Sequence, residues 1–209
     1  MSGGVLPMAE LGVRLRRART ARGWSLAELA QHSGLSTSFL SLVENGNSDI
    51  SMGRLARLLD TFELTLTELA QHAGPAAEDT SVDSYQVLRR GDHPVLETPS
   101  GIHTVVLGRS GAHGTERMLI TLDPGAHVDT SDFVGRRSAE TFMLMIAGGL
   151  VVGFRNGERV SVRTGDSLVF PSSMVVSSRN DGTTPATAYI EHPGYGNERR
   201  AGVQNTGRQ

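Results

Sequence analysis

The segment from Gly23 to Gly46 constrains the fold more than any other part of this sequence. Ser25 and Glu28 have the spacing of a capping box, which predicts that a helix begins directly after Ser25. Gly34 suits a sharp turn, because glycine reaches positive φ at little steric cost, and Ser36 is a favourable N-cap for a second helix. In a pair of short helices joined by a tight turn, the second helix can lie in the major groove of DNA. The segment therefore predicts nucleic-acid binding.

The second of these helices, residues 36–43, has an apolar side and a hydroxyl-rich side. Helical spacing turns Leu40 and Val43 inward and leaves short hydroxyl side chains on the outward side. Such side chains can reach base edges or phosphates without filling the groove. We therefore predict DNA contacts by the residues on this side and directly after the helix: Thr37, Ser38, Ser41 and Asn45.

Flanking stretches complete a five-helix bundle over residues 9–72. Apolar residues recur at helical spacing from about residue 9 to residue 22 and again after Ser51, while Thr65 and Glu68 repeat the capping-box spacing. The first helix carries five arginines, and we expect Arg14 and Arg17 among them to contact phosphates. The alternative is that these arginines form an ordinary solvated helix face.

This region resembles the DNA-binding domain of the Xre/Cro-type phage-repressor family. The resemblance runs from Leu11 to His72 and implies that residues 36–43 are the recognition helix. It departs from the family at Leu26, where the family often carries a glutamine that clamps a phosphate. An alternative is a bundle of this kind that contacts only other proteins. The matching residues are Leu29, Ala30, Gly34, Leu35, Ser36, Leu40, Val43, Glu44 and Gly46.

Composition limits the compartment and the partners of this chain. The formal net charge is −2, and all 20 basic residues are arginine. The overall charge therefore does not indicate a polyanionic partner such as DNA. A homodimer would double the phosphate contacts, and we expect one. The absence of cysteine excludes disulfides and thiolate metal sites. No apolar run approaches the length of a membrane span and the N-terminus lacks a signal-peptide pattern, so we expect a cytoplasmic protein.

After residue 72 the helical period disappears. Residues 73–83 are small, polar and acidic and predict a linker, and residues 196–209 predict a disordered tail. Between them, short runs rich in Val, Ile, Leu and Thr alternate with turn sequences, which is typical of a sandwich or barrel. The expected strands are residues 85–89, 103–107, 117–122, 141–146, 150–154, 159–163, 167–170, 174–178 and 186–191.

The turn sequences of this second region resemble those of the cupin family. The matching parts are Asp123-Pro124-Gly125 through residues 140–146 to Gly148, and Thr164-Gly165-Asp166 through Pro171 to Asn180. The resemblance implies a cupin-like double-sheet β-barrel over residues 84–195, and so an α + β multidomain chain. A domain of the Xre type followed by a cupin implies a transcription factor whose barrel senses a small molecule and helps it to dimerise.

The resemblance also locates the positions at which many cupins bind a divalent metal. These positions fall near Gly135 and Arg137, on Thr141 and on Val176, which do not supply the imidazole and carboxylate groups that such metals prefer. We therefore expect no metal and no other cofactor. The alternative is a non-standard site in which His127 and Asp129 approach Glu140 across the intervening loop.

Without a metal, the barrel interior becomes a candidate effector pocket. Strand alternation places Thr141, Met143 and Met145 on one side, with Phe142, Leu144 and Ile146 on the other. The first side would give an adaptable, mostly apolar lining, or would simply fill the core. The second side needs cover, by a dimer contact or by another sheet. Arg137 could bind an anionic group of the ligand, such as a carboxylate. The predicted ligand-binding residues are Arg137, Thr141, Met143, Met145, Met174 and Val176.

Together these patterns favour a ligand-responsive regulator that binds double-stranded DNA as a homodimer and is not an enzyme. Its two half-sites would lie about 34 Å apart, one turn of the duplex. The main alternative is a metal-dependent cupin enzyme with an appended DNA-binding domain, which would need a metal with an open coordination position. A third possibility is a binding module whose helices bind another protein.

Overall fold

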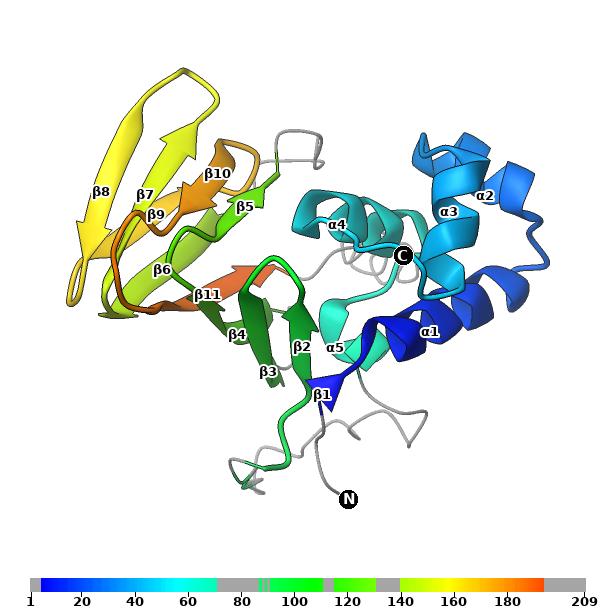
Figure 1. Ribbon diagram of the computed structural model, residues 1–209, viewed down its shortest axis with the longest axis horizontal. Helices are drawn as coiled ribbons and strands as arrows, with labels where there is room; N and C mark the ends of the chain where they lie inside the picture. Colours follow the sequence, from blue (N-terminus) through cyan, green and yellow to red (C-terminus); the bar gives the residue numbers. More distant parts are fainter. Residues whose placement is uncertain are drawn as a thin grey trace, which may run out of the picture.

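The computed structural model describes residues 5–70, 87, 89, 91–110, 115–130 and 140–193. Apart from one two-residue strand at the start, helices occupy the first part of the chain and strands the second, as predicted (Figure 1). The helices are α1 (Met8–Thr20), α2 (Leu26–Ser33), α3 (Thr37–Glu44), α4 (Met52–Thr61) and α5 (Leu66–Ala70). Within the described residues, no helix is both long and apolar enough to cross a membrane.

Local capping explains where α2 and α3 begin and end. The Glu28 carboxylate accepts a 2.7 Å hydrogen bond from the Ser25 N–H, and the Ser25 hydroxyl oxygen accepts one of 3.2 Å from the Glu28 N–H. Gly34 ends α2 with a φ of 68°, and the Ser36 hydroxyl oxygen accepts from the Phe39 N–H to start α3. Both helix starts and the turn between them are confirmed.

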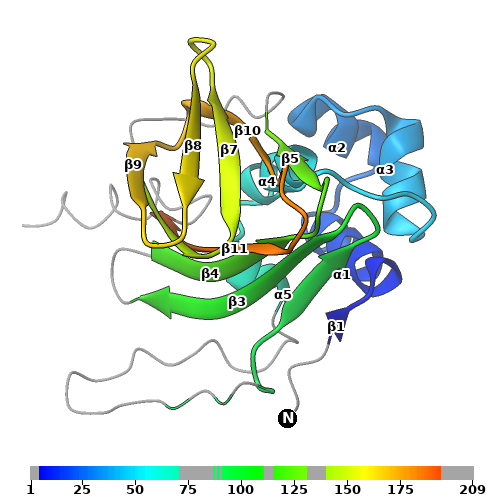
Figure 2. The same ribbon diagram turned by 60° about the vertical axis from the view of Figure 1, so that its left-hand side comes forward.

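The strands form two antiparallel-dominated sheets stacked on each other (Figure 2). The seven-stranded sheet has the order β1-β2-β3-β4-β11-β6-β9 and the four-stranded sheet the order β5-β10-β7-β8. The two sheets are separate hydrogen-bonded units among the described strands, so the predicted double sheet is confirmed as an open arrangement rather than a closed barrel. The strands are β1 (Val5–Leu6), β2 (Val95–Thr98), β3 (Ile102–Ser110), β4 (Thr115–Leu122), β5 (His127–Asp129), β6 (Glu140–Ala147), β7 (Gly149–Phe154), β8 (Arg159–Arg163), β9 (Ser167–Pro171), β10 (Val175–Arg179) and β11 (Ala186–Pro193).

The expected strands correspond to β3, β4 and β6 to β11, with ends shifted by a few residues. The expected strand at 85–89 lies mostly outside the described residues, as do the linker at 73–83 and the tail at 196–209. Three strands were not predicted: β1, β2 and β5. β1 lies ahead of the helices, where it pairs in parallel with β2, so residues before the predicted bundle belong to the sheet.

One face of the seven-stranded sheet, here called the inner face, packs against two different neighbours. At one end it meets the four-stranded sheet, where Met143, Met145 and Val152 are buried together. At the other end Val106 and Met118 are buried in the same cluster as the helical core. Helices and sheet therefore share one continuous apolar core.

A buried carboxylate completes this junction. Glu116 on β4 is 0% exposed, and its Oε1 accepts hydrogen bonds from the Thr67 N–H at 2.7 Å and the Thr67 hydroxyl at 2.8 Å. Thr67 lies in the first turn of α5, where backbone N–H groups lack helical acceptors. The sheet thus caps a helix of the N-terminal unit, which fixes the two parts to each other.

A second close approach joins α4 to β5. A Cβ on Gly53 would lie 3.0 Å from the Asp129 carbonyl oxygen and 3.2 Å from the Thr130 Cα. Glycine is the residue that permits this distance, because any side chain would force the helix away from the strand. The helical unit therefore touches both sheets.

Candidate nucleic-acid interface

Helix α3, the predicted recognition helix, is anchored on one side and open on the other. Leu40 and Val43 are buried in the helical core, as the sequence predicted. Thr37 and Ser38 are exposed and Ser41 is half-buried, so all three hydroxyls lie on the outward part of the helix. The helix therefore offers short polar side chains to a partner while its apolar side holds its position.

A buried ion pair fixes the angle between α3 and α1. The Arg19 guanidinium donates to both oxygens of the Glu44 carboxylate, at 2.7 and 2.9 Å, and also to the Trp24 carbonyl oxygen at 2.6 Å. The hydrogen bond to Glu44 raises the pKa of Arg19 above its usual value. A two-point pair of this kind restricts orientation as well as distance. Arg19 is therefore a structural arginine that positions α3.

The two α1 arginines predicted to contact phosphates differ in their surroundings. Arg14 donates to the carbonyl oxygens of Leu69, at 2.8 Å, and Ala70, and to the Glu10 carboxylate at 2.6 Å. Its guanidinium therefore joins α1 to the carbonyl end of α5, where cations are favoured. Arg17 is exposed on the same helix. Of the two, Arg17 is the more exposed.

Asn45, the other predicted contact, ends the recognition helix. Its side-chain amide donates to the Ser41 carbonyl oxygen at 2.8 Å, and the residue is exposed. The same carbonyl oxygen also accepts the Asn45 backbone N–H at 3.2 Å, so Asn45 bonds twice to the last turn of α3.

The structure adds an apolar residue to this surface that the sequence analysis did not single out. Leu42 is 47% exposed, although it lies in α3 between buried Val43 and half-buried Ser41. Its position four residues after Ser38 places both on the same side of the helix. The sequence contained this signal, since the helical spacing that put Ser38 outward also puts Leu42 outward.

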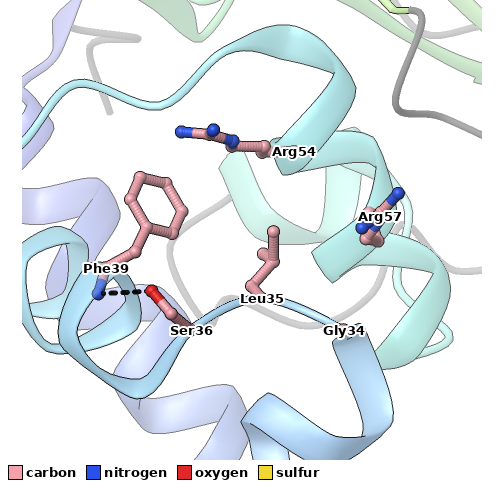
Figure 3. A pocket seen from close by; sticks show the side chains of 6 residues that line it. All are labelled: Gly34, Leu35, Ser36, Phe39, Arg54 and Arg57. Carbon is pink, nitrogen blue, oxygen red and sulfur yellow. Dashed lines mark hydrogen bonds between the residues drawn. The ribbon is translucent and has the colours of Figure 1, made fainter.

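Beside α3 lies a hollow of about 270 Å³ between the α2–α3 turn and α4 (Figure 3). Two arginines of α4 border it, and the Arg54 guanidinium carbon lies 4.6 Å from the centre of the Phe39 ring. The hollow thus brings cationic groups beside the N-terminal turn of α3, where backbone N–H groups also favour anions. The sequence did not reveal it, because α3 and α4 are linked by an irregular loop. Its lining residues are Gly34, Leu35, Ser36, Phe39, Arg54 and Arg57.

In the double sheet, alternation along β6 is as predicted. Thr141, Met143 and Met145 are buried on the inner face, and the Thr141 hydroxyl shares a 2.6 Å hydrogen bond with that of Ser172. Met143 and Met145 belong to the core between the sheets. Two further predicted lining residues, Met174 and Val176, are half-buried, whereas Arg137 lies outside the described residues.

The residues present do not fit the metal that the cupin resemblance implies. Thr141 and Val176 stand where ligands would be needed, and neither supplies an imidazole or a carboxylate. His127 and Asp129 are exposed on β5, and Glu140 is exposed at the start of β6 in the other sheet. Within the described ranges, no three His, Cys, Asp or Glu side chains gather into a possible metal site.

The described structure combines a capped helix-turn-helix pair, within a unit of five helices, with two stacked sheets. Known proteins with these features are transcriptional regulators, to which this chain is similar. Residues 10–73, which carry the helices, match the family described as a helix-turn-helix domain. The whole fold is similar to the crystal structure of an HTH_3 family transcriptional regulator from Vibrio cholerae. That similarity has a TM-score of 0.65 and 19% identity, and covers 90% of this chain and 97% of that one.

Two other solved structures are similar over about half of this chain. One is the cupin_2 domain of an XRE family transcriptional regulator from Enterobacter cloacae, with a TM-score of 0.41, 16% identity, and coverage of 44% of this chain and 96% of that one. The other is an RmlC-like cupin from Shewanella frigidimarina, with a TM-score of 0.42, 16% identity, and coverage of 53% and 92%. No curated protein matches the sequence.

Proposed function

We propose that this protein is a regulator of transcription that binds double-stranded DNA in a sequence-specific manner through α3. The observation that carries the proposal is the outward side of this helix, where exposed hydroxyls stand on a helix anchored by the Arg19–Glu44 pair. Rigid presentation of short polar groups suits direct contact with base edges in the major groove.

Within this proposal, three kinds of side chain do different work. Thr37, Ser38 and Ser41 contact base edges and nearby phosphates, with Asn45 beside them. Leu42 packs against the methyl group of a thymine, which is the apolar group in the major groove. The remaining contacts are to phosphates, from the exposed arginines Arg17 and Arg54.

We further propose that the protein acts as a cytoplasmic homodimer controlled by a small effector in the double sheet. Met143 and Met145 line the interior, with Met174 half-buried at its side, and methionine adapts to irregular ligands. An effector would change DNA binding only if it bound one arrangement of the dimer better than another. The absence of fitting metal ligands among the described residues favours a sensor over a metal-dependent enzyme.

A mobility-shift assay with genomic fragments tests the DNA-binding proposal. Wild-type protein should bind some fragments more tightly than bulk DNA, and replacing Thr37, Ser38 and Ser41 together by alanine should reduce that preference by about tenfold or more. The matched control replaces three exposed hydroxyl residues of the strand region, Ser161, Ser167 and Thr183, by alanine and should bind as wild type. Equal binding of all fragments by the wild type would refute the proposal.

The sensor proposal has its own test. Elemental analysis of purified full-length protein should find no stoichiometric metal, and a small molecule that raises the melting temperature should also shift the DNA-binding curve. Stoichiometric iron, zinc or manganese would instead support the metal-dependent enzyme. Stabilising compounds that leave DNA affinity unchanged would contradict control by the double sheet.

A further inference from the structure

The face of the seven-stranded sheet opposite the helices, here called the outer face, carries a row of apolar side chains in register. Backbone pairing aligns one residue from each of five consecutive strands. All five are half-buried, and their neighbours along each strand point to the inner face. The row consists of Val95, Val105, Leu119, Tyr189 and Leu144.

The same face is still more exposed towards its β9 edge. Phe142 pairs with Val169, which is 54% exposed, and Ile146 is 49% exposed. The Phe142 and Tyr189 rings meet edge to face with their centres 6.5 Å apart, which extends the row into a patch. Among the described residues, none of the patch side chains belongs to either apolar core.

Charged residues border the apolar patch on two sides. On one side the Arg117 guanidinium donates to the Glu191 carboxylate at 3.0 Å. On the other side His103 lies between Glu97, at 3.4 Å, and Asp123, at 3.2 Å. An apolar centre with a polar rim is the anatomy of a protein–protein interface. Because the rim carries both signs of charge, the face can complement a copy of itself.

The size of the face agrees with what a stable dimer needs. It spans the six strands from β2 to β9, and β4, β6 and β11 are each eight residues long. The two outermost of these strands are shorter, with four residues in β2 and five in β9. With strands about 4.8 Å apart and a rise of about 3.3 Å per residue, the face measures roughly 650 Å². Standard interfaces bury about 600 to 1,000 Å² of each partner, so the face lies within that range.

We propose that a second copy of this chain packs on the outer face, sheet against sheet, to form a twofold dimer. The helices pack on the inner face, so both recognition helices stay accessible in such a dimer (Figure 2). The inference deepens the proposed function, and rests on it only in so far as a dimer is the DNA-binding form. The occupant is a second copy because one flat, self-complementary face satisfies both partners at once.

Light scattering on the full-length protein tests the interface. Wild type should be a dimer at micromolar concentration, and the double variant Ile146→Arg, Val169→Arg should raise the dissociation constant of the dimer by about 100-fold or more, because unpaired charges would be buried. The matched control is Val160→Arg, a 37% exposed valine on β8 of the other sheet, which should remain dimeric. Circular dichroism checks that each variant is folded.

A second measurement covers the case in which the double variant does not fold. The chain contains no cysteine, so Tyr189→Cys and Val160→Cys each introduce a single thiol. A short bismaleimide should cross-link Tyr189→Cys into dimers and leave Val160→Cys monomeric on a denaturing gel. A monomeric wild type, a dimer unaffected by the double variant, or equal cross-linking would each overturn the inference. A dimer that binds no DNA selectively would refute the proposed function alone.

Discussion

Helix α3 and the outer face of the seven-stranded sheet are built in opposite ways. The outward side of α3 is mainly polar, with exposed hydroxyls and one exposed leucine, and water satisfies it when no partner is bound. The outer face of the sheet is apolar at its centre and charged at its rim. The polar surface of α3 suits transient binding of a polar partner, and the apolar face of the sheet suits a permanent protein–protein interface. Under the two proposals, DNA binding would be reversible and the dimer that binds it would be permanent.

The largest expected effect tests the anchoring of α3. Glu44→Ala would leave the Arg19 guanidinium, whose side chain is only 11% exposed, without its carboxylate, and should lower the free energy of unfolding by about 3 kcal/mol. Urea denaturation measures this loss. Glu28→Ala, which removes an exposed capping carboxylate, should cost clearly less. Equal losses for both would mean that the pair contributes no special rigidity.

The next effect concerns the junction between the helices and the sheet. Thr67→Val removes the hydroxyl that donates to the buried Glu116 carboxylate, and should lower the free energy of unfolding by about 2 kcal/mol. Hydrogen exchange should accelerate first in α5, because its N-terminal cap is weakened. A control is Thr61→Val, since the Thr61 hydroxyl donates to a carbonyl within its own helix. Acceleration spread evenly over the protein would argue against a local role.

A smaller effect tests the one apolar residue on the polar surface. Replacing thymine by uracil at the contacted position of a selected DNA site should weaken wild-type binding by about fourfold, the worth of one buried methyl group. Leu42→Ala should bind the two DNAs equally, whereas Leu42→Met should keep most of the preference. Wild-type protein that ignores thymine-to-uracil changes throughout its site would exclude a methyl contact by Leu42.

The smallest effect lies at the rim of the outer face. The hydrogen bond to Asp123, and then that to Glu97, raises the pKa of His103. The charged imidazole therefore adds stability below about pH 6.5, the unfolded value, and this stability is lost as pH rises through the raised folded pKa. These groups are partly exposed, so the effect should stay near 0.5 kcal/mol. Melting curves from pH 5 to 9 should show it, and Asp123→Asn should reduce it.

The sequence predicted the features that depend on neighbouring residues. Ser25, Glu28, Gly34 and Ser36 act within one turn of the chain, and the structure confirms their roles. Alternation along β6 likewise predicted which residues share a side of the strand. These signals need only short-range spacing, which a single sequence contains.

The features that the sequence did not predict depend on distant residues. Arg14 bonds to Leu69 across 55 positions, and Thr67 bonds to Glu116 across 49, so no local spacing indicates either pair. The strands β1 and β5 have two and three residues, too few for an alternating pattern. The hollow beside Arg54 likewise forms only when α4 packs next to α3.

The carboxylate cap on α5 has a consequence for the spacing of DNA half-sites. Glu116 fixes the helical unit to the seven-stranded sheet. In a dimer, the distance between the two α3 helices would therefore be set by how the seven-stranded sheets of the two copies pack. Extra residues inserted between positions 70 and 91 would then leave the preferred distance between half-sites unchanged. A new spacing would instead arise from changes in the sheets themselves, so operator geometry and sheet packing would have to evolve together.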